Sequence, residues 1–119
     1  MSKLLIVDDE LDIREFAKSF FKKRGIDVLT ASGGGEALEI IENEKPDLVL
    51  LDIIMPDMNG EEVYMRMRDI QPDVKVLVSS GYSIDWQARQ MLENGCNGFI
   101  QKPFKIEALS FQIREALSS

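Results

Sequence analysis

The stretch LLIVDDE, from Leu4 to Glu10, is an aliphatic run that ends on adjacent carboxylates. A near-continuous aliphatic run predicts a strand that is covered on both faces, which is the condition of strands in a parallel sheet. The like charges of Asp8 and Asp9 repel each other, so they need either open water or a cation beside them. Glu10 is predicted only to open the helix that follows, where a negative charge suits the N-terminus.

Four more apolar runs follow along the chain, and the segments between them are amphipathic. The predicted strands are residues 4–7, 26–30, 48–51, 74–78 and 98–101. In the other segments, apolar residues recur every three or four positions, which predicts helices that pack one apolar stripe on a sheet. In the first helix, that stripe consists of Ile13, Phe16, Ala17 and Phe20. Gly25 and Gly95 stand where helix C-termini need a left-handed residue. The alternation predicts a (βα)5 α/β sandwich that forms one domain over residues 1–119.

Composition excludes several classes of function. The 119 residues carry a formal net charge of −7, which makes a nucleic-acid backbone a poor partner. The chain has no histidine, which removes histidine-based acid–base catalysis and most zinc sites. No apolar stretch approaches a membrane span and no signal peptide is recognisable, so we expect a cytoplasmic location. Cys96, the single cysteine, cannot form an internal disulfide and is expected to be a small buried side chain.

Polar side chains follow four of the predicted strands at their carboxyl ends. They are Asp8 and Asp9, Asp52, Ser80, and Lys102. In an open parallel sheet, ligands bind outside the carboxyl ends of the strands, so these residues form the candidate site. Three carboxylates in one concavity favour Mg²⁺, which binds few carboxylates and leaves positions for water or phosphate. The lysine and the serine hydroxyl add groups that stabilise a phosphoryl charge. Each carboxylate taken alone would instead indicate a turn or a helix cap.

These residues fall within motifs that resemble a known family, the receiver domains of two-component response regulators. The motifs are IVDDE at residues 6–10, LVLLDIIMPDMNG at 48–60, VLVSSGY at 76–82 and FIQKPF at 99–104. In this order and combination they are highly specific, and the resemblance covers essentially the whole chain. It implies a single receiver domain with a flavodoxin-like fold, whose parallel strands lie in the order 2-1-3-4-5.

The resemblance implies a role for each residue of the site. Asp52 would accept a phosphoryl group from a histidine kinase or a phosphotransfer protein, and the donor imidazole would belong to that partner. Asp9, Asp52 and the backbone carbonyl of Ile54 would bind Mg²⁺ directly, while Asp8 would act through metal-bound water. Lys102 would pair with the phosphoryl oxygens. The protein would be a switch with slow self-hydrolysis and not an enzyme in the usual sense.

The resemblance also implies a route for the signal. Ser80 would move to hydrogen-bond the phosphoryl group, and Phe99 would swing inward with it. The signal would reach a partner protein at the face made by the fourth helix, the fifth strand and the fifth helix. The residues predicted to contact that partner are Ile84, Trp86, Phe99 and Phe104. Pro103 matches a lysine–proline step that is a cis peptide bond in this family.

Some positions differ from the common pattern of the family. Ser80 stands where many relatives have threonine, which would loosen the switch because serine has more rotamer freedom. Phe99 stands where many have tyrosine, so contacts that need the tyrosine hydroxyl are lost. Ile54 and Tyr82 occupy the two positions that flank the path of hydrolytic water in receivers. Their bulk predicts a long-lived aspartyl phosphate.

Alternative functions stay open from the sequence. The chain resembles receivers fused to sensor kinases, so the first alternative is a phosphate shuttle or sink, or a receiver cut from a hybrid kinase. A Mg²⁺-dependent phosphohydrolase with an aspartate nucleophile would need a second acid two residues after Asp52, where Ile54 stands. A receiver that works without phosphorylation is disfavoured because all the site residues are present.

Two further features have simple interpretations. The segment GGGEAL at residues 33–38 lacks the ending of a phosphate-binding loop, which predicts a flexible loop and a helix start. Asn97 and Gly98 replace acids that some DNA-binding relatives use to dimerise, so we expect a monomer.

Overall fold

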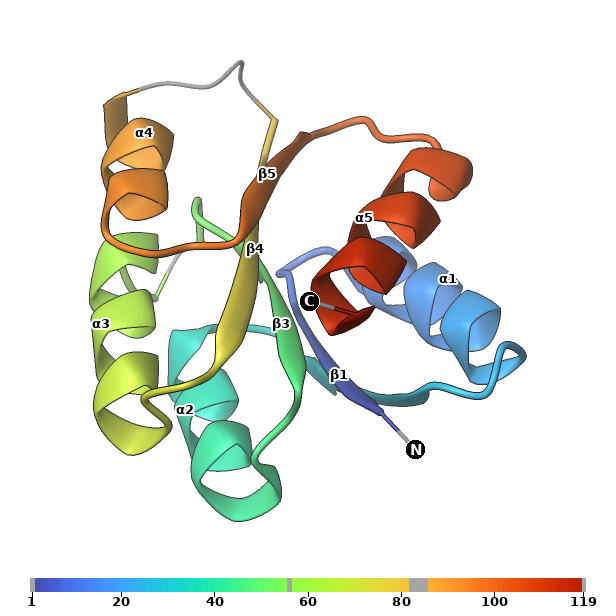
Figure 1. Ribbon diagram of the computed structural model, residues 1–119, viewed down its shortest axis with the longest axis horizontal. Helices are drawn as coiled ribbons and strands as arrows, with labels where there is room; N and C mark the ends of the chain where they lie inside the picture. The colour runs from blue at the N-terminus through green and yellow to red at the C-terminus, as the bar shows by residue number, and fades with distance from the viewer. Residues whose placement is uncertain (1, 56, 82–85, 119) are drawn as a thin grey trace.

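The computed structural model describes residues 2–55, 57–81 and 86–118, with only the backbone of residue 86. Within those ranges, five strands and five helices alternate along the chain (Figure 1). The strands are Lys3–Val7 (β1), Asp27–Ala31 (β2), Leu48–Asp52 (β3), Lys75–Ser80 (β4) and Gly98–Gln101 (β5). The helices are Leu11–Lys22 (α1), Gly34–Glu44 (α2), Gly60–Ile70 (α3), Trp86–Glu93 (α4) and Ile106–Ser118 (α5). None of these helices is long and apolar enough to cross a membrane.

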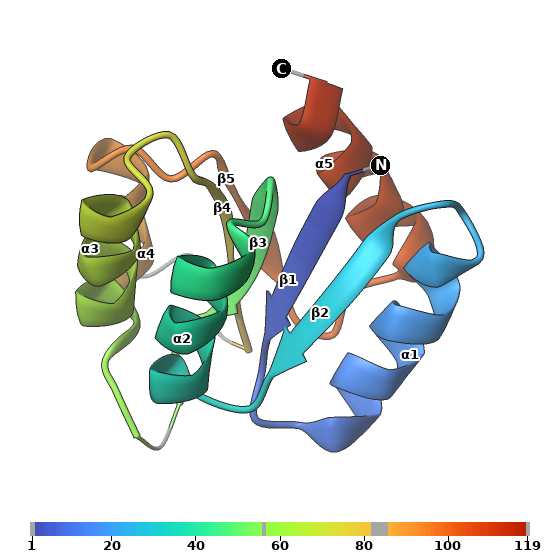
Figure 2. The ribbon, with the colours of Figure 1, turned by 90° about the horizontal axis from the view of Figure 1, so that it is seen from below.

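The strands form one parallel sheet in the order β2-β1-β3-β4-β5. Helices α1 and α5 cover one face, and α2, α3 and α4 cover the other (Figures 1 and 2). Both the (βα)5 fold class and the strand order are therefore confirmed. The register places Asp52 at the end of β3 opposite Ser79 of β4.

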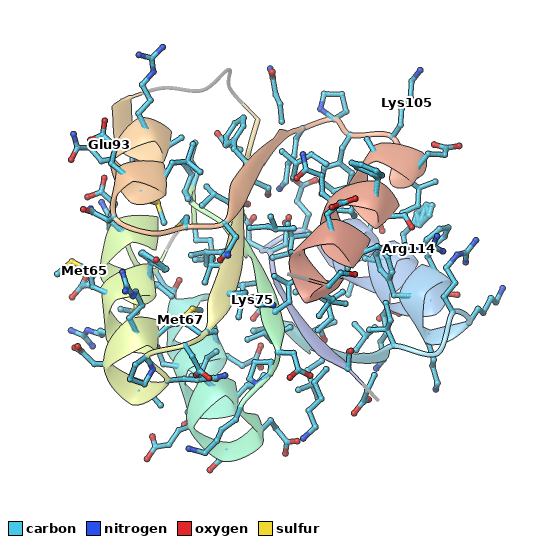
Figure 3. The ribbon with its side chains drawn as sticks, viewed as in Figure 1. Met65, Met67, Lys75, Glu93, Lys105 and Arg114 are labelled. Carbon is cyan, nitrogen blue, oxygen red and sulfur yellow. The ribbon has the colours of Figure 1, made fainter. Side chains whose placement is uncertain are left out.

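The sheet has a hydrophobic core on each of its two faces. Along β1, Leu4 and Ile6 pack toward α1 and α5, whereas Leu5 and Val7 pack toward the other helix layer. This arrangement explains why the aliphatic run is unbroken, since alternate residues of a strand point to opposite faces. The same separation is visible on a helix: Met67 of α3 is fully buried, whereas Met65 projects outward and is 66% exposed (Figure 3).

The buried stripe of α1 differs from the predicted one. Phe16 is 54% exposed, and the fully buried residues are Ala17 and Phe21. Phe20 is only partly buried, and its ring meets Phe21 edge-on with 5.0 Å between the ring centroids. The predicted buried face of α1 is therefore shifted by about one residue from the observed face. Phe20 and Phe21 are equally apolar, so periodicity alone cannot decide which ring faces the sheet.

The glycine positions predicted to end helices are confirmed. Gly25 and Gly95 have φ values of +81° and +118°, in the region that favours glycine. The residue that caps the C-terminus of α2 is Lys45, which adopts the left-handed conformation with a φ of 48°. Because this position is not a glycine, the sequence did not indicate the end of that helix. Cys96 is buried, as predicted.

Candidate functional site

The candidate site lies at the carboxyl edge of the sheet, where four strands end. Asp8 follows β1, Asp52 ends β3, Ser80 ends β4 and Lys102 follows β5. The two aspartates and the serine are nearly inaccessible, with exposed fractions of 3%, 4% and 1% for residues Asp8, Asp52 and Ser80. The structure thus brings together residues that are far apart in the sequence, because parallel strands deliver their carboxyl ends to one edge.

Lys102 connects the carboxylates of this site. Its Nζ atom lies 2.6 Å from Oδ2 of Asp8, 3.1 Å from Oδ2 of Asp52 and 3.5 Å from Oε1 of Glu10. The lysine side chain is only 12% exposed, so the ion pairs with Asp8 and Asp52 are shielded from water. The positive charge makes it possible for two aspartates to be buried side by side.

Burial and charge act in opposite directions on the pKa values in this cluster. Burial raises the pKa of Asp52, while the amide hydrogen bond from Ile54 and the charge of Lys102 oppose that rise. Burial alone would lower the pKa of Lys102, but its contacts with Asp8 and Asp52 outweigh burial and raise it. Lys102 therefore stays protonated at neutral pH.

Backbone groups orient both buried carboxylates. The amide of Glu10 donates a 2.9 Å hydrogen bond to Oδ1 of Asp8, and the amide of Ile54 donates a 3.0 Å bond to Oδ1 of Asp52. Arg14 of α1 donates from Nη1 to the backbone carbonyl of Asp8 at 2.7 Å. Arg14 was not predicted as a site residue from the sequence. Its side chain contacts a backbone carbonyl and belongs to no sequence motif. Only its position one turn into the predicted first helix could have indicated it.

A metal ion has suitable ligands at this edge. One carboxylate oxygen from each of Asp8, Asp9 and Glu10 lies within 4.8 Å of the others. These donors are all oxygens, which suit a hard cation such as Mg²⁺. The prediction that Glu10 only opens the helix is incomplete, because the turn before α1 also brings its carboxylate into the cluster. Asp52, at the end of β3, is linked to Asp8 of this cluster by Lys102, whose Nζ atom contacts both carboxylates.

The residues predicted to transmit the signal are placed only in part. Phe99 is half-buried and packs on the core beneath α2, α3 and α4, opposite Val78 of β4. The backbone carbonyl of Ser80 accepts a 2.7 Å hydrogen bond from the amide of Lys102, which couples the ends of β4 and β5. The Lys102–Pro103 peptide bond is cis, as the resemblance implies. Tyr82, Ile84 and the side chain of Trp86 lie outside the described residues.

Phe104 and Phe99 pack on opposite faces of the sheet. Both were predicted to belong to the partner surface of α4, β5 and α5, and Phe104 packs with the core of α1 and α5. The two lie on opposite sides of the sheet because the chain turns toward α1 after β5. Phe104 lines a groove of about 610 Å³ together with Ile13, Phe16 and Lys102. This groove runs between α1 and the start of α5, directly beside the site.

The arrangement defines a class of protein: a parallel α/β domain with a buried aspartate and a partly buried lysine in contact at its carboxyl edge. Residues 4–114 match the family described as the response regulator receiver domain. The chain belongs to the receiver domain family of two-component response regulators.

Individual relatives support this assignment. The chain is 35% identical to sporulation initiation phosphotransferase F of Bacillus subtilis, over 97% of this chain and 93% of that protein. It is also 35% identical to the sensor kinase CckA of Brucella abortus, but it spans only 12% of that protein's length. Among solved structures, a CheY-like receiver domain protein from Methanospirillum hungatei superimposes with a TM-score of 0.93 at 33% identity, over 99% of this chain and 94% of that one.

Proposed function

We propose that the protein is a phosphoacceptor switch whose acceptor is Asp52. The observation that carries the proposal is the contact of Lys102 Nζ with Oδ2 of Asp52, 3.1 Å away, between side chains that are only 12% and 6% exposed. An oxygen of Asp52 would attack the phosphorus of a phosphohistidine on a kinase or phosphotransfer protein. The P–N bond would break as the P–O bond forms, and the departing imidazole would keep its electron pair and take up a proton.

Mg²⁺ would supply charge neutralisation for the phosphoryl oxygens when bound. Asp9, Asp52 and the backbone carbonyl of Ile54 would hold it directly, and Asp8 would act through a water molecule. The Glu10 carboxylate, which lies beside Asp8 and Asp9, would add to the negative charge that attracts the ion. The chain's own groups would do the rest: Lys102 would exchange its contact with Asp52 for a phosphoryl oxygen.

The groove beside Lys102 supports a protein donor. Ile13, Phe16 and Phe104 present apolar surface at the entrance to the site, and Phe16 of α1 is exposed although it is large and apolar. A small phosphodonor would leave this apolar surface exposed, whereas a helical donor protein would bury it. The chain contains no histidine of its own, so the phosphorylated imidazole would come from that partner.

The likeness to a sporulation phosphotransferase along nearly its full length favours a second possibility, a phosphate shuttle. In that role Asp52 would pass the phosphoryl group to a second histidine-containing protein. Transfer from labelled protein to such an acceptor would distinguish a shuttle from a switch that signals by contact. We also propose a cytoplasmic location, which the free, buried thiol of Cys96 supports.

The test is labelling with acetyl phosphate, with and without Mg²⁺, on the wild type and on Asp52→Asn. We expect one phosphoryl group per wild-type chain in Mg²⁺, and none on the variant. The matched control is Asp73→Asn, which changes an exposed aspartate that precedes β4, at the end of the strand opposite to Ser80. This variant should label like the wild type. Equal labelling of the wild type and Asp52→Asn would refute the proposal.

A further inference from the structure

The loop between β3 and α3, which follows Asp52, is fastened to the neighbouring helix α2 by Asp57. Oδ1 of Asp57 accepts a 3.1 Å hydrogen bond from the amide of Gly34, and Oδ2 accepts a 3.3 Å bond from the amide of Gly35. The first amides of a helix have no partner within the helix, and they attract negative charge. The Gly34 bond, followed by the Gly35 bond, lowers the pKa of Asp57 below its usual range.

The glycines at the start of α2 make this approach sterically possible. A Cβ atom on Gly33 would lie 2.8 Å from both carboxylate oxygens of Asp57, and one on Gly34 would lie 2.7 Å from Cγ2 of Val63. A Cβ atom on Gly35 would lie 4.0 Å from Oδ2 of Asp57, an ordinary contact distance. The segment predicted to be a flexible loop therefore receives the Asp57 carboxylate, and only the predicted helix start is confirmed.

The other end of the same loop is joined to the phosphoacceptor. Ile54 pairs with Asn59 in an isolated antiparallel bridge, which closes the loop on itself. The amide of Ile54 donates the 3.0 Å hydrogen bond to Oδ1 of Asp52. The Ile54 side chain is 48% exposed. A displacement of the loop at Asp57 would pass to the backbone of Ile54 and from there to the Asp52 carboxylate.

We propose that Asp57 is a positioning residue for the phosphoryl and metal site. It does not touch the reacting atoms, but it holds the loop in which the amide of Ile54 orients Asp52 and the carbonyl of Ile54 would be available to bind Mg²⁺. This inference rests on the proposed roles of Asp52 and Ile54. Loss of the Asp57 contact would lower Mg²⁺ affinity, because an outer-shell partner of a metal ligand has been removed.

The chain offers a variant pair that separates this contact from the charge of Asp57. Gly33→Ala pushes on the carboxylate from the helix side without changing any charge, whereas Gly35→Ala adds the same methyl group at an ordinary distance. Asp57→Ala removes the contact directly. The Mg²⁺ dissociation constant is measured by titration calorimetry on each folded variant, and amide hydrogen exchange at Gly34 and Gly35 reports whether the contact is broken.

We expect Gly33→Ala and Asp57→Ala each to weaken Mg²⁺ binding by about tenfold, which is the smallest loss of affinity typical for removal of an outer-shell partner. Gly35→Ala should bind Mg²⁺ like the wild type. Asp57→Ala made in the Gly33→Ala background should add no further loss, because both changes break one contact. If exchange at Gly34 and Gly35 speeds up while Mg²⁺ affinity stays unchanged, Asp57 merely caps α2 and the inference is wrong. A wild type that binds no Mg²⁺ and takes no phosphoryl group would overturn the proposed function as well.

Discussion

The Nζ atom of Lys102 lies 2.6 Å from Oδ2 of Asp8, although the strands that these residues follow, β5 and β1, are separated in the sheet by β3 and β4. The long lysine side chain therefore reaches across the carboxyl edge and meets Asp52 on the way. In the structure, this one cation holds together the two buried carboxylates that the proposed phosphoryl chemistry requires. The stability of the fold and the function of the site are thus linked through the same three side chains.

Removal of Lys102 should destabilise the protein in metal-free buffer. Lys102→Met leaves Asp8 and Asp52 buried without their counter-charge, and we expect a loss of about 3 kcal/mol in the free energy of unfolding. Mg²⁺ should restore part of that loss, because a divalent cation compensates the same carboxylates. Urea denaturation with EDTA and with Mg²⁺ measures both effects. Lys105→Met is the control, since Lys105 projects away from the fold (Figure 3). Equal stability of Lys102→Met and wild type would show that the ion pairs contribute nothing.

Neutralising Asp52 should stabilise the protein. Its pKa is raised in the folded state by burial, so the folded protein holds this proton more tightly than the unfolded chain does. Stability therefore falls as pH rises above the ordinary carboxyl pKa of 3.8, and the loss persists at neutral pH. We expect Asp52→Asn to be about 1 kcal/mol more stable than the wild type at pH 7 in EDTA.

The pH dependence of that difference is the more specific test. As pH falls through 3.8 the carboxyl group becomes protonated in the unfolded chain as well, so the advantage of Asp52→Asn should shrink toward zero. Unfolding curves in urea between pH 3.5 and pH 7 follow it, with Asp73→Asn as an exposed control. An advantage that does not change with pH would rule out burial of the charge as the cause.

The two aspartates after β1 should contribute unequally to Mg²⁺ binding. Asp9 is exposed and free to bind the ion directly, whereas Asp8 is buried and already engaged by Lys102. We expect Asp9→Ala to weaken binding by more than about tenfold and Asp8→Ala to weaken it less. Titration calorimetry gives both constants, and Asp12→Ala, on the exposed side of α1, provides a control for the loss of one charge. A larger effect at Asp8 would reverse the proposed division between direct and water-mediated ligands.

The lifetime of the aspartyl phosphate should depend on Ile54. Its side chain is 48% exposed immediately after the acceptor strand, where it would obstruct water that approaches the phosphoryl group. Ile54→Asn replaces this bulk with an amide that can orient water, and should shorten the half-life several-fold. Decay of labelled protein in Mg²⁺ measures this half-life, with Met65→Asn on α3, where Met65 is also exposed, as the control. If Ile54→Asn decays at the wild-type rate, the side chain does not govern access of water.

Much of the site was predictable because the rule that locates it is simple. Once the apolar runs are recognised as parallel strands, the residues after them must meet at one edge, and this rule identifies Asp8, Asp52, Ser80 and Lys102. The distances inside the site were not predictable. The contact between Lys102 and Glu10, and the bond from Arg14 to Asp8, depend on the path of the turn that leads into α1.

The amino-acid sequence by itself determined the order of the elements, the carboxylates and lysine at the strand ends, and the glycines that end two helices. These features follow from local periodicity and from the backbone conformations that each residue allows. Only the tertiary structure decided that Phe21 and not Phe16 enters the core, that Phe104 lies apart from Phe99, and that Asp57 reaches the amides of α2. Those choices depend on contacts between segments distant in the chain, where packing and hydrogen bonding select among residues that are locally equivalent.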